Sequence, residues 1–239
     1  YKTLSYDADE PLDWVHSTAE GTLEFTVLFY IPKKAPADIY RADYQPGVKL
    51  YVNRVFITDD DKELLPTWLR FVKGVIDSSD LPLNVSREIL QQNRIMAKIK
   101  SNSVKKVLDK IKTISKNKDK YEGFYNEFGR LLKEGVYQEY EHKEALTDLL
   151  RFKSTKEDGY VSLQDYVDRM DSDQKSIYYI TGTNDSSLRE SPLLEMYKEN
   201  DIEVLILDDE IDEIIMPSIP TYKEKDLKSV NRSGAADDL

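Results

Sequence analysis

The sequence predicts a mixed α/β fold, in which two α/β layers are joined by a helical section, and three patterns support it. Apolar residues alternate with other residues from Leu23 to Ile31, as in a strand with one face in a core. From Ile89 to Ile114 they recur at the three-and-four spacing of a long amphipathic helix. Between Ser176 and Leu207, a strand, a helix and a strand follow one another at the length of a parallel β-α-β unit.

The first layer is expected to contain a second strand and a short helix. Pro46-Gly47 turns the chain into a strand over Val48–Ile57, whose second half is apolar on both faces and is therefore predicted to be central. Pro66 is predicted to open a helix that runs through Ile76. A loop rich in turn residues follows over Asp77–Ser86.

The helical section is predicted to hold three helices. The long helix from Ile89 is broken at Asn117–Asp119, and a second amphipathic helix through Phe124 and Leu132 stops at Gly135. Apolar spacing from Ala145 to Leu150 indicates a third helix.

The second layer begins with a capping box, in which Ser162 and Asp165 open a helix that runs to Met170. The strand–helix–strand unit follows, but Gly182–Asp185 at its first turn lacks the glycine spacing of a dinucleotide-binding fold. Beyond Pro220 the chain becomes charged and then small and polar, as in a frayed linker. The predicted divisions are a first α/β layer over 1–85, a helical connector over 86–158, a small α/β/α subdomain over 159–220 and a polar linker tail over 221–239.

Composition limits the chemistry of this chain. Its 239 residues are 40% hydrophobic, enough for a real core, and they include no cysteine and no apolar run of membrane-spanning length. His16 and His142 are the only histidines and are far apart, so a metal site is not expected, and neither a P-loop nor a serine-hydrolase elbow occurs. The chain starts at Tyr1 without methionine or leader, as expected of a piece of a longer protein. The sequence therefore predicts no enzyme activity for this segment by itself.

The charge is unevenly distributed. The net charge is −11, yet the stretch Arg94–Lys120 carries ten basic residues against Asp109 and Asp119, a local charge of +8 that leaves −19 elsewhere. A solvated helix face explains such a stretch, and so does a surface that attracts a nucleotide or an acidic partner domain.

Arg87 has an unusual position in the segment Leu81–Asn93. It is predicted to lie in the first turn of the following helix, where the helix dipole disfavours a cation and free main-chain N–H groups favour an anion. An external phosphate would explain it, as would a side chain that simply extends into solvent.

The run Leu50–Asn93 (LYVNRVFITDDDKELLPTWLRFVKGVIDSSDLPLNVSREILQQN) closely resembles the middle domain of the heat-shock protein 90 chaperones, with the bacterial HtpG-type branch nearest. The likeness extends over nearly the whole chain, through Lys106–Ile111, Phe128–Gly135, Leu149–Thr155, Val161–Met170, Ile177–Thr181 and Ile202–Glu213. It implies that the first layer is an α/β sandwich related to the second domain of GHKL-type ATPases.

The resemblance also implies a function, namely the middle segment of a cytoplasmic, homodimeric, ATP-dependent chaperone of the stress response. Arg87 would sense and stabilise the γ-phosphate, with Gln91 supporting it. Asn84 lies ahead of the predicted helix, and this position makes it a candidate to brace the loop or to contact the nucleotide edge. ATP and Mg²⁺ would be held mainly by a missing N-terminal domain, with no cofactor in this fragment. Further partners would be a C-terminal dimerisation domain, unfolded or partly folded client proteins and cochaperones, but neither nucleic acid nor membrane.

Five residues are candidates for client binding. Trp14, Phe56 and Trp68 are aromatic residues near predicted element boundaries, although a place in the buried core is the more frequent explanation for each taken singly. Glu213 matches a glutamate that bacterial family members commonly follow with tryptophan, and Ile214 is a smaller apolar substitute here.

Two other functions remain open. A non-catalytic scaffold would relay conformational change and would use Arg87 only structurally. A nucleic-acid-handling transducer domain would use the basic stretch Arg94–Lys120, but the overall acidity and the lack of interleaved aromatic residues count against it.

Overall fold

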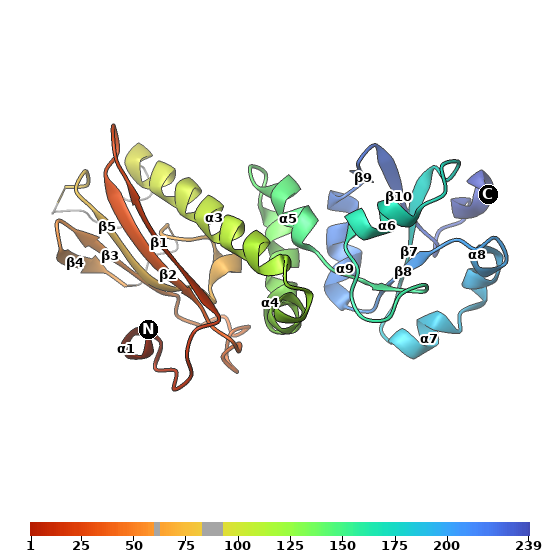
Figure 1. Cartoon of the computed structure of the whole chain (residues 1–239), viewed down its shortest axis with the longest axis horizontal. Coiled ribbons are helices and arrows are strands. Elements are labelled where there is room, and N and C mark those ends of the chain that lie inside the picture. The colour runs from red at the N-terminus through yellow and green to blue at the C-terminus, as the bar shows by residue number, and fades with distance from the viewer. Residues whose placement is uncertain (60–62, 83–92) are drawn as a thin grey trace. The chain divides into compact units, whose positions relative to one another are not determined.

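The computed structural model describes residues 1–59, 63–82 and 93–239. These residues form two compact units, Tyr1–Leu131 and Leu132–Leu239, each with a five-stranded mixed sheet (Figure 1). The predicted mixed α/β class is therefore confirmed.

The first unit is a sheet of strand order β1-β2-β5-β3-β4. Only β3 and β5 pair in parallel, and the other neighbouring strands are antiparallel. Its elements are α1 (Lys2–Ser5), β1 (Asp13–Ala19), β2 (Phe25–Ile31), β3 (Gly47–Val52), β4 (Val55–Thr58), the 3₁₀ turn η1 (Thr67–Leu69), β5 (Lys73–Ser78), α3 (Arg94–Ser115) and the first part of α4 (Lys118–Gln138).

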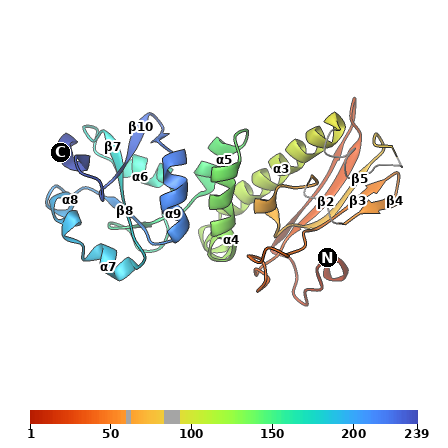
Figure 2. The same cartoon turned by 180° about the vertical axis from the view of Figure 1, so that it is seen from behind.

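One face of this sheet packs into a core with α3, which lies along the sheet in both views (Figures 1 and 2). The predicted alternation of β2 is confirmed, because Phe25, Val27, Phe29 and Ile31 are all buried. Phe71, which precedes β5, stacks on Phe128 of α4 with ring centroids 4.5 Å apart.

Two expectations for the first layer were wrong. The strand predicted over Val48–Ile57 is a hairpin, since Asn53 and Arg54 both have positive φ angles (49° and 66°) and form a two-residue turn between β3 and β4. As a result β4 is an edge strand, not a central one. The helix predicted from Pro66 to Ile76 is only η1, and the chain then enters β5, where burial in the sheet overrides local helical spacing.

Gly74 makes the pairing of β2 and β5 possible. Its φ is +156°, and a Cβ atom at this position would lie 1.9 Å from the carbonyl oxygen of Leu28. Only a residue without a side chain allows the two backbones this close approach.

The helices differ from expectation at their ends. Asn93 has an extended backbone (φ −84°, ψ 121°), so α3 begins at Arg94. The predicted break near residues 117–119 is confirmed, but α4 continues past Gly135 to Gln138, because this glycine lies within the helix. The third predicted helix is α5 (Lys143–Leu149).

The second unit has strand order β6-β8-β7-β10-β9, in which β7 lies parallel to both β8 and β10. Figure 1 shows α6 and α9 on one side of this sheet and α7 and α8 on the other. The bounds are β6 (Lys153–Ser154), α6 (Leu163–Arg169), β7 (Ser176–Thr181), α7 (Asp185–Arg189), the 3₁₀ turn η2 (Pro192–Leu194), α8 (Glu195–Glu199), β8 (Val204–Leu207), α9 (Glu210–Ile215), the 3₁₀ turn η3 (Met216–Ser218), β9 (Thr221–Tyr222), β10 (Lys225–Ser229) and the 3₁₀ turn η4 (Ala235–Asp238).

The parallel β-α-β unit and the Ser162–Asp165 capping box are confirmed. The frayed tail expected over residues 221–239 was wrong, because this segment supplies β9, β10 and η4. Two residues of this polar segment attach it to the rest of the second unit: Val230 is buried, and Tyr222 donates a hydrogen bond to Asp148 Oδ1 at 2.7 Å.

Candidate functional site

The predicted catalytic residues Arg87, Gln91 and Asn84 lie outside the described residues. The structure does describe the helix that follows them. Asn93 Oδ1 accepts hydrogen bonds from the backbone N–H groups of Ile95 and Met96 at 2.8 and 3.2 Å, which caps the N-terminus of α3. The start of α3 is thus fixed by a side-chain cap, while the role of Arg87 stays a prediction.

The face of the first sheet opposite its core, here called the outer face, carries two of the predicted client-binding residues. Trp14 on β1 is 56% exposed and pairs with Tyr30 of β2, while Phe56 on β4 is 50% exposed and pairs with Tyr51 of β3. Side chains alternate along a strand, and the strand register therefore puts Trp14 and Tyr51 on the same face. The rings of Tyr51 and Phe56 meet edge to face at 5.8 Å, so Phe56 is on this face as well.

Trp68, the third aromatic candidate, does not lie on a surface. Its side chain is fully buried beside Leu69 in η1. Its proposed client contact is therefore wrong: the short turn places the indole in the core of the first unit.

The other two candidates lie on α9 in the second unit. Asp209 and Asp212 form a capping box at the start of α9, and three acidic residues in the first turn suit the positive end of the helix dipole. Glu213 Oε1 accepts a hydrogen bond from Oγ1 of Thr181, the last residue of β7, at 3.2 Å, so one of its carboxylate oxygens already has a partner within the chain. Ile214 is 59% exposed and available to a partner.

A buried ion pair ties α9 to α4. Lys133 Nζ lies 2.7 Å from Asp212 Oδ1 and 3.9 Å from Asp209 Oδ2, and both Lys133 and Asp212 are almost completely buried. Burial raises the pKa of Asp212, although the Lys133 cation and the Asp209 N–H oppose this effect. The pair fixes the position of the helix that presents Ile214.

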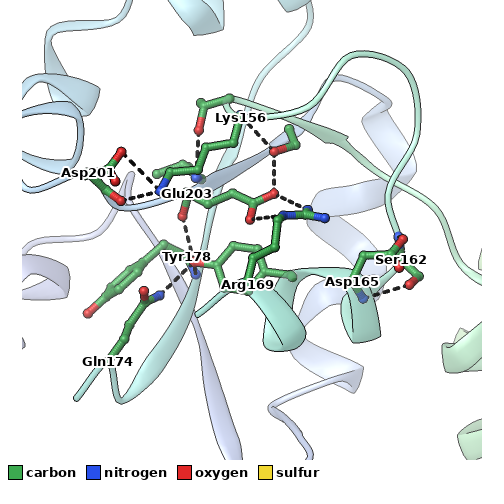
Figure 3. A network of polar contacts seen from close by, with 12 residues as sticks. Lys156, Ser162, Asp165, Arg169, Gln174, Tyr178, Asp201 and Glu203 are labelled. Atoms are coloured by element: carbon green, nitrogen blue, oxygen red, sulfur yellow. Dashed lines mark hydrogen bonds and ion pairs between the residues drawn. The ribbon is translucent and has the colours of Figure 1, made fainter. Parts of the chain in front are cut away.

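A second buried carboxylate, Glu203, holds a polar network together (Figure 3). Its two oxygens accept hydrogen bonds from Arg169 at 2.6 and 3.1 Å, and one of them, Oε1, also accepts a hydrogen bond from Ser154 Oγ at 2.5 Å. Tyr166 OH donates to the Glu203 carbonyl at 2.6 Å and accepts the Tyr178 N–H at 3.1 Å. Burial is the main reason that the pKa of Tyr166 is raised. The network ties together α6, β6, β7 and β8, and we assign it a structural role.

Sequence reasoning missed both of these clusters. Lys133 directly follows Leu131 and Leu132 on the apolar face of α4. A lysine at such a position is a sign, detectable in the sequence, that its cation is buried. Nothing in the sequence pairs it with Asp212, 79 positions later, because only the packing of α4 against α9 brings them together.

The basic stretch Arg94–Lys120 becomes α3 and the start of α4. Lys110 and Lys120 reach Asp13 of β1 at 3.6 and 3.2 Å, so two of the ten cations serve packing within the first unit. Exposed positions on α3 include Arg94, Lys98, Lys105, Lys106 and Lys112.

The described residues, 1–59, 63–82 and 93–239, show neither a metal cluster nor a membrane-spanning helix. Within these ranges, no group of three or more acidic or histidine side chains is arranged to hold a metal ion. No helix in the same ranges combines the length and apolarity needed to cross a bilayer.

The two units, each with a mixed sheet and its own helices, match the fold of a chaperone middle domain. The middle domain of a Plasmodium falciparum heat-shock protein superimposes with a TM-score of 0.86 at 32% identity, covering 98% of this chain and 93% of that one. The family model described as Hsp90 protein matches residues 1–238. The chain belongs to the Hsp90 family.

Three bacterial relatives, each named chaperone protein HtpG, match along essentially the whole chain. The protein from Treponema denticola is 62% identical and that from Sulfurovum sp. 59%, with 100% and 99% of this chain covered. The protein from Wolinella succinogenes is 57% identical over the whole chain. The chain spans 38–39% of the length of these relatives.

Proposed function

We propose that this chain is the middle segment of an ATP-dependent chaperone. The observation that carries the proposal is the match of nearly the whole chain to HtpG relatives, joined to the structural match with an Hsp90-type middle domain. The other parts of such a protein would supply the nucleotide cradle and the dimer contact. The proposal places the protein in the cytoplasm.

Within this proposal, Arg87 completes ATP hydrolysis in the adjoining N-terminal domain, where ATP and Mg²⁺ are bound. Phosphoryl transfer depends mainly on positive charge and donors placed around developing oxygen charge. A guanidinium is permanently charged and forked, which suits the γ-phosphate better than an amine. Gln91 and Asn84 would support it with neutral amide groups.

The test is steady-state ATP hydrolysis by the longer protein carrying Arg87→Ala, with nucleotide affinity measured beside it. A charge-assisted hydrogen bond is worth about 1.5–3 kcal/mol, so turnover should fall about tenfold to a hundredfold while ATP still binds. Arg94→Ala is the matched control, because Arg94 is an exposed arginine at the start of α3. Unchanged turnover in Arg87→Ala would favour the non-catalytic scaffold.

We further propose that the outer face and the exposed tip of α9 contact client proteins. Trp14, Phe56 and Ile214 are each at least half exposed, and large exposed apolar side chains commonly anchor partners. The test is suppression of aggregation of a denatured model protein by the longer chaperone carrying Trp14→Ala with Phe56→Ala, or Ile214→Ala. Tyr140→Ala is the control, since Tyr140 is 96% exposed but lies outside both surfaces. Equal protection by all variants would contradict the assignment.

A further inference from the structure

The first unit contains a cavity of about 230 Å³, and Trp14 and Phe56 of the outer face are not among its described lining residues. It lies between the loop before β3 and the stretch that leads through η1 to β5. Val48, Leu64 and Leu69 contribute apolar surface, and each is at most 3% exposed. A buried cavity of about 150 Å³ already holds a benzene ring, so this one is large enough for an aromatic or branched apolar group.

Two tyrosines and two arginines also contribute to the lining. Tyr40 and Tyr44 both contribute to it. The guanidinium groups of Arg70 and Arg130 each lie 5.4 Å from the centre of the Tyr40 ring, and Lys73 Nζ donates a hydrogen bond to Tyr44 OH at 2.9 Å. These contacts hold the two tyrosine walls in place and put positive charge beside them.

Arg41 provides a cation that a ligand could use. It lines the cavity and forms a two-pronged ion pair with Asp43 at 3.0 Å for each contact. Both side chains are about 70% exposed. An exposed ion pair contributes little to stability, so a carboxylate from a ligand can replace Asp43 at small cost.

We propose that this cavity binds a small apolar carboxylate, with its apolar group between the tyrosine walls and its carboxylate on Arg41. A free aromatic or branched acid and the C-terminal residue of a polypeptide share this chemistry. Its test uses neither an Arg87 variant nor ATP, so it can fail or succeed independently of the chaperone proposal.

The probe is N-acetylphenylalanine, titrated into the ¹⁵N-labelled 239-residue chain and followed by backbone amide shifts. Its amide, N-acetylphenylalaninamide, is the matched neutral probe. We expect saturable shifts at residues 40–48 and 64–72 with a dissociation constant on the order of 1 mM, given the small size of the ligand. The neutral probe should bind at least about fivefold more weakly, because it lacks the charge-assisted contact. A tripeptide that ends in phenylalanine with a free carboxylate distinguishes a free acid from the C-terminal residue of a polypeptide. It should bind as tightly as N-acetylphenylalanine only if the end of a polypeptide chain can enter the cavity.

Three substitutions at exposed positions test the geometry. Ala42→Trp should fill the entrance and abolish binding, and Arg41→Gln should remove the preference for the acid over the amide. Asp43→Asn should strengthen binding of the acid about twofold or more, because it releases Arg41. Amide shifts outside the cavity report whether each variant is folded. Equal affinity for acid and amide, or binding that Ala42→Trp leaves intact, would overturn the proposal.

Discussion

Replacing Lys133 by methionine would remove the cation that neutralises a buried carboxylate while keeping most of the side-chain volume. Asp212 is 1% exposed, and its Oδ1 lies 2.7 Å from Lys133 Nζ. Removing one partner of a buried ion pair typically costs about 3–5 kcal/mol, because the other charge is left uncompensated. We expect a loss in this range for the second unit.

The assay can separate the two units. Trp14 and Trp68 are the only tryptophans, and both belong to the first unit. Tryptophan fluorescence during urea unfolding therefore reports on the first unit, and circular dichroism reports on both. Lys133→Met should lower the midpoint of the second unit by about 1–5 M urea, given typical denaturant slopes of about 1–3 kcal/mol per molar urea.

The pH dependence gives a sharper test. Burial raises the pKa of Asp212 in the folded state above its ordinary value of 3.8. The folded state therefore holds this proton more tightly than the unfolded state, so the contribution of the group to stability is greatest below pH 3.8 and is lost as the pH rises through the folded pKa. Without Lys133 the pKa of Asp212 in the folded state rises further. The stability lost in Lys133→Met should therefore be small near about pH 4 and should grow toward neutrality.

Two matched variants complete the experiment. Asp212→Asn alone should lower the stability less than Lys133→Met does, because Lys133 Nζ still has the Asp209 carboxylate 3.9 Å away as an ion-pair partner. The double variant should recover part of the loss, since neither buried charge remains. A loss below about 1 kcal/mol in Lys133→Met, or a loss independent of pH, would refute a neutralising role for Lys133.

Three further predictions concern stability, each measured by denaturant unfolding. Gly74→Ala should destabilise the first unit by several kcal/mol or prevent folding, because its Cβ would lie 1.9 Å from the Leu28 carbonyl oxygen; a fully stable variant would contradict the close approach. Tyr166→Phe should cost about 1–3 kcal/mol, since the Glu203 carbonyl and a backbone N–H lose a buried partner; a neutral result would mean that water replaces the hydroxyl. Ser162→Ala should cost about 1 kcal/mol through loss of the α6 cap, and Ser162→Asn, which preserves a capping oxygen, should restore most of it.

Elements with strong local signals were predictable from the sequence. The alternation along β2 and the Ser162–Asp165 capping box depend on neighbouring residues, and both appear as expected. Asn93, which starts α3, is also a good capping residue, but the apolar spacing continued across it and concealed the start. Asn53-Arg54 lacks the glycine typical of a two-residue hairpin turn, so β3 and β4 were predicted as one strand.

The sequence by itself determined the fold class, the family and the candidate residues, because periodicity, capping and motifs are local properties of the chain. Tertiary structure decided which candidates can reach a partner: Trp14 and Phe56 are exposed on one sheet face, whereas Trp68 is buried. It also decided the pairing of Lys133 with Asp212 and the lining of the cavity beside Arg41. These features join residues distant in sequence, and only the packing of helices and strands brings such residues within contact distance.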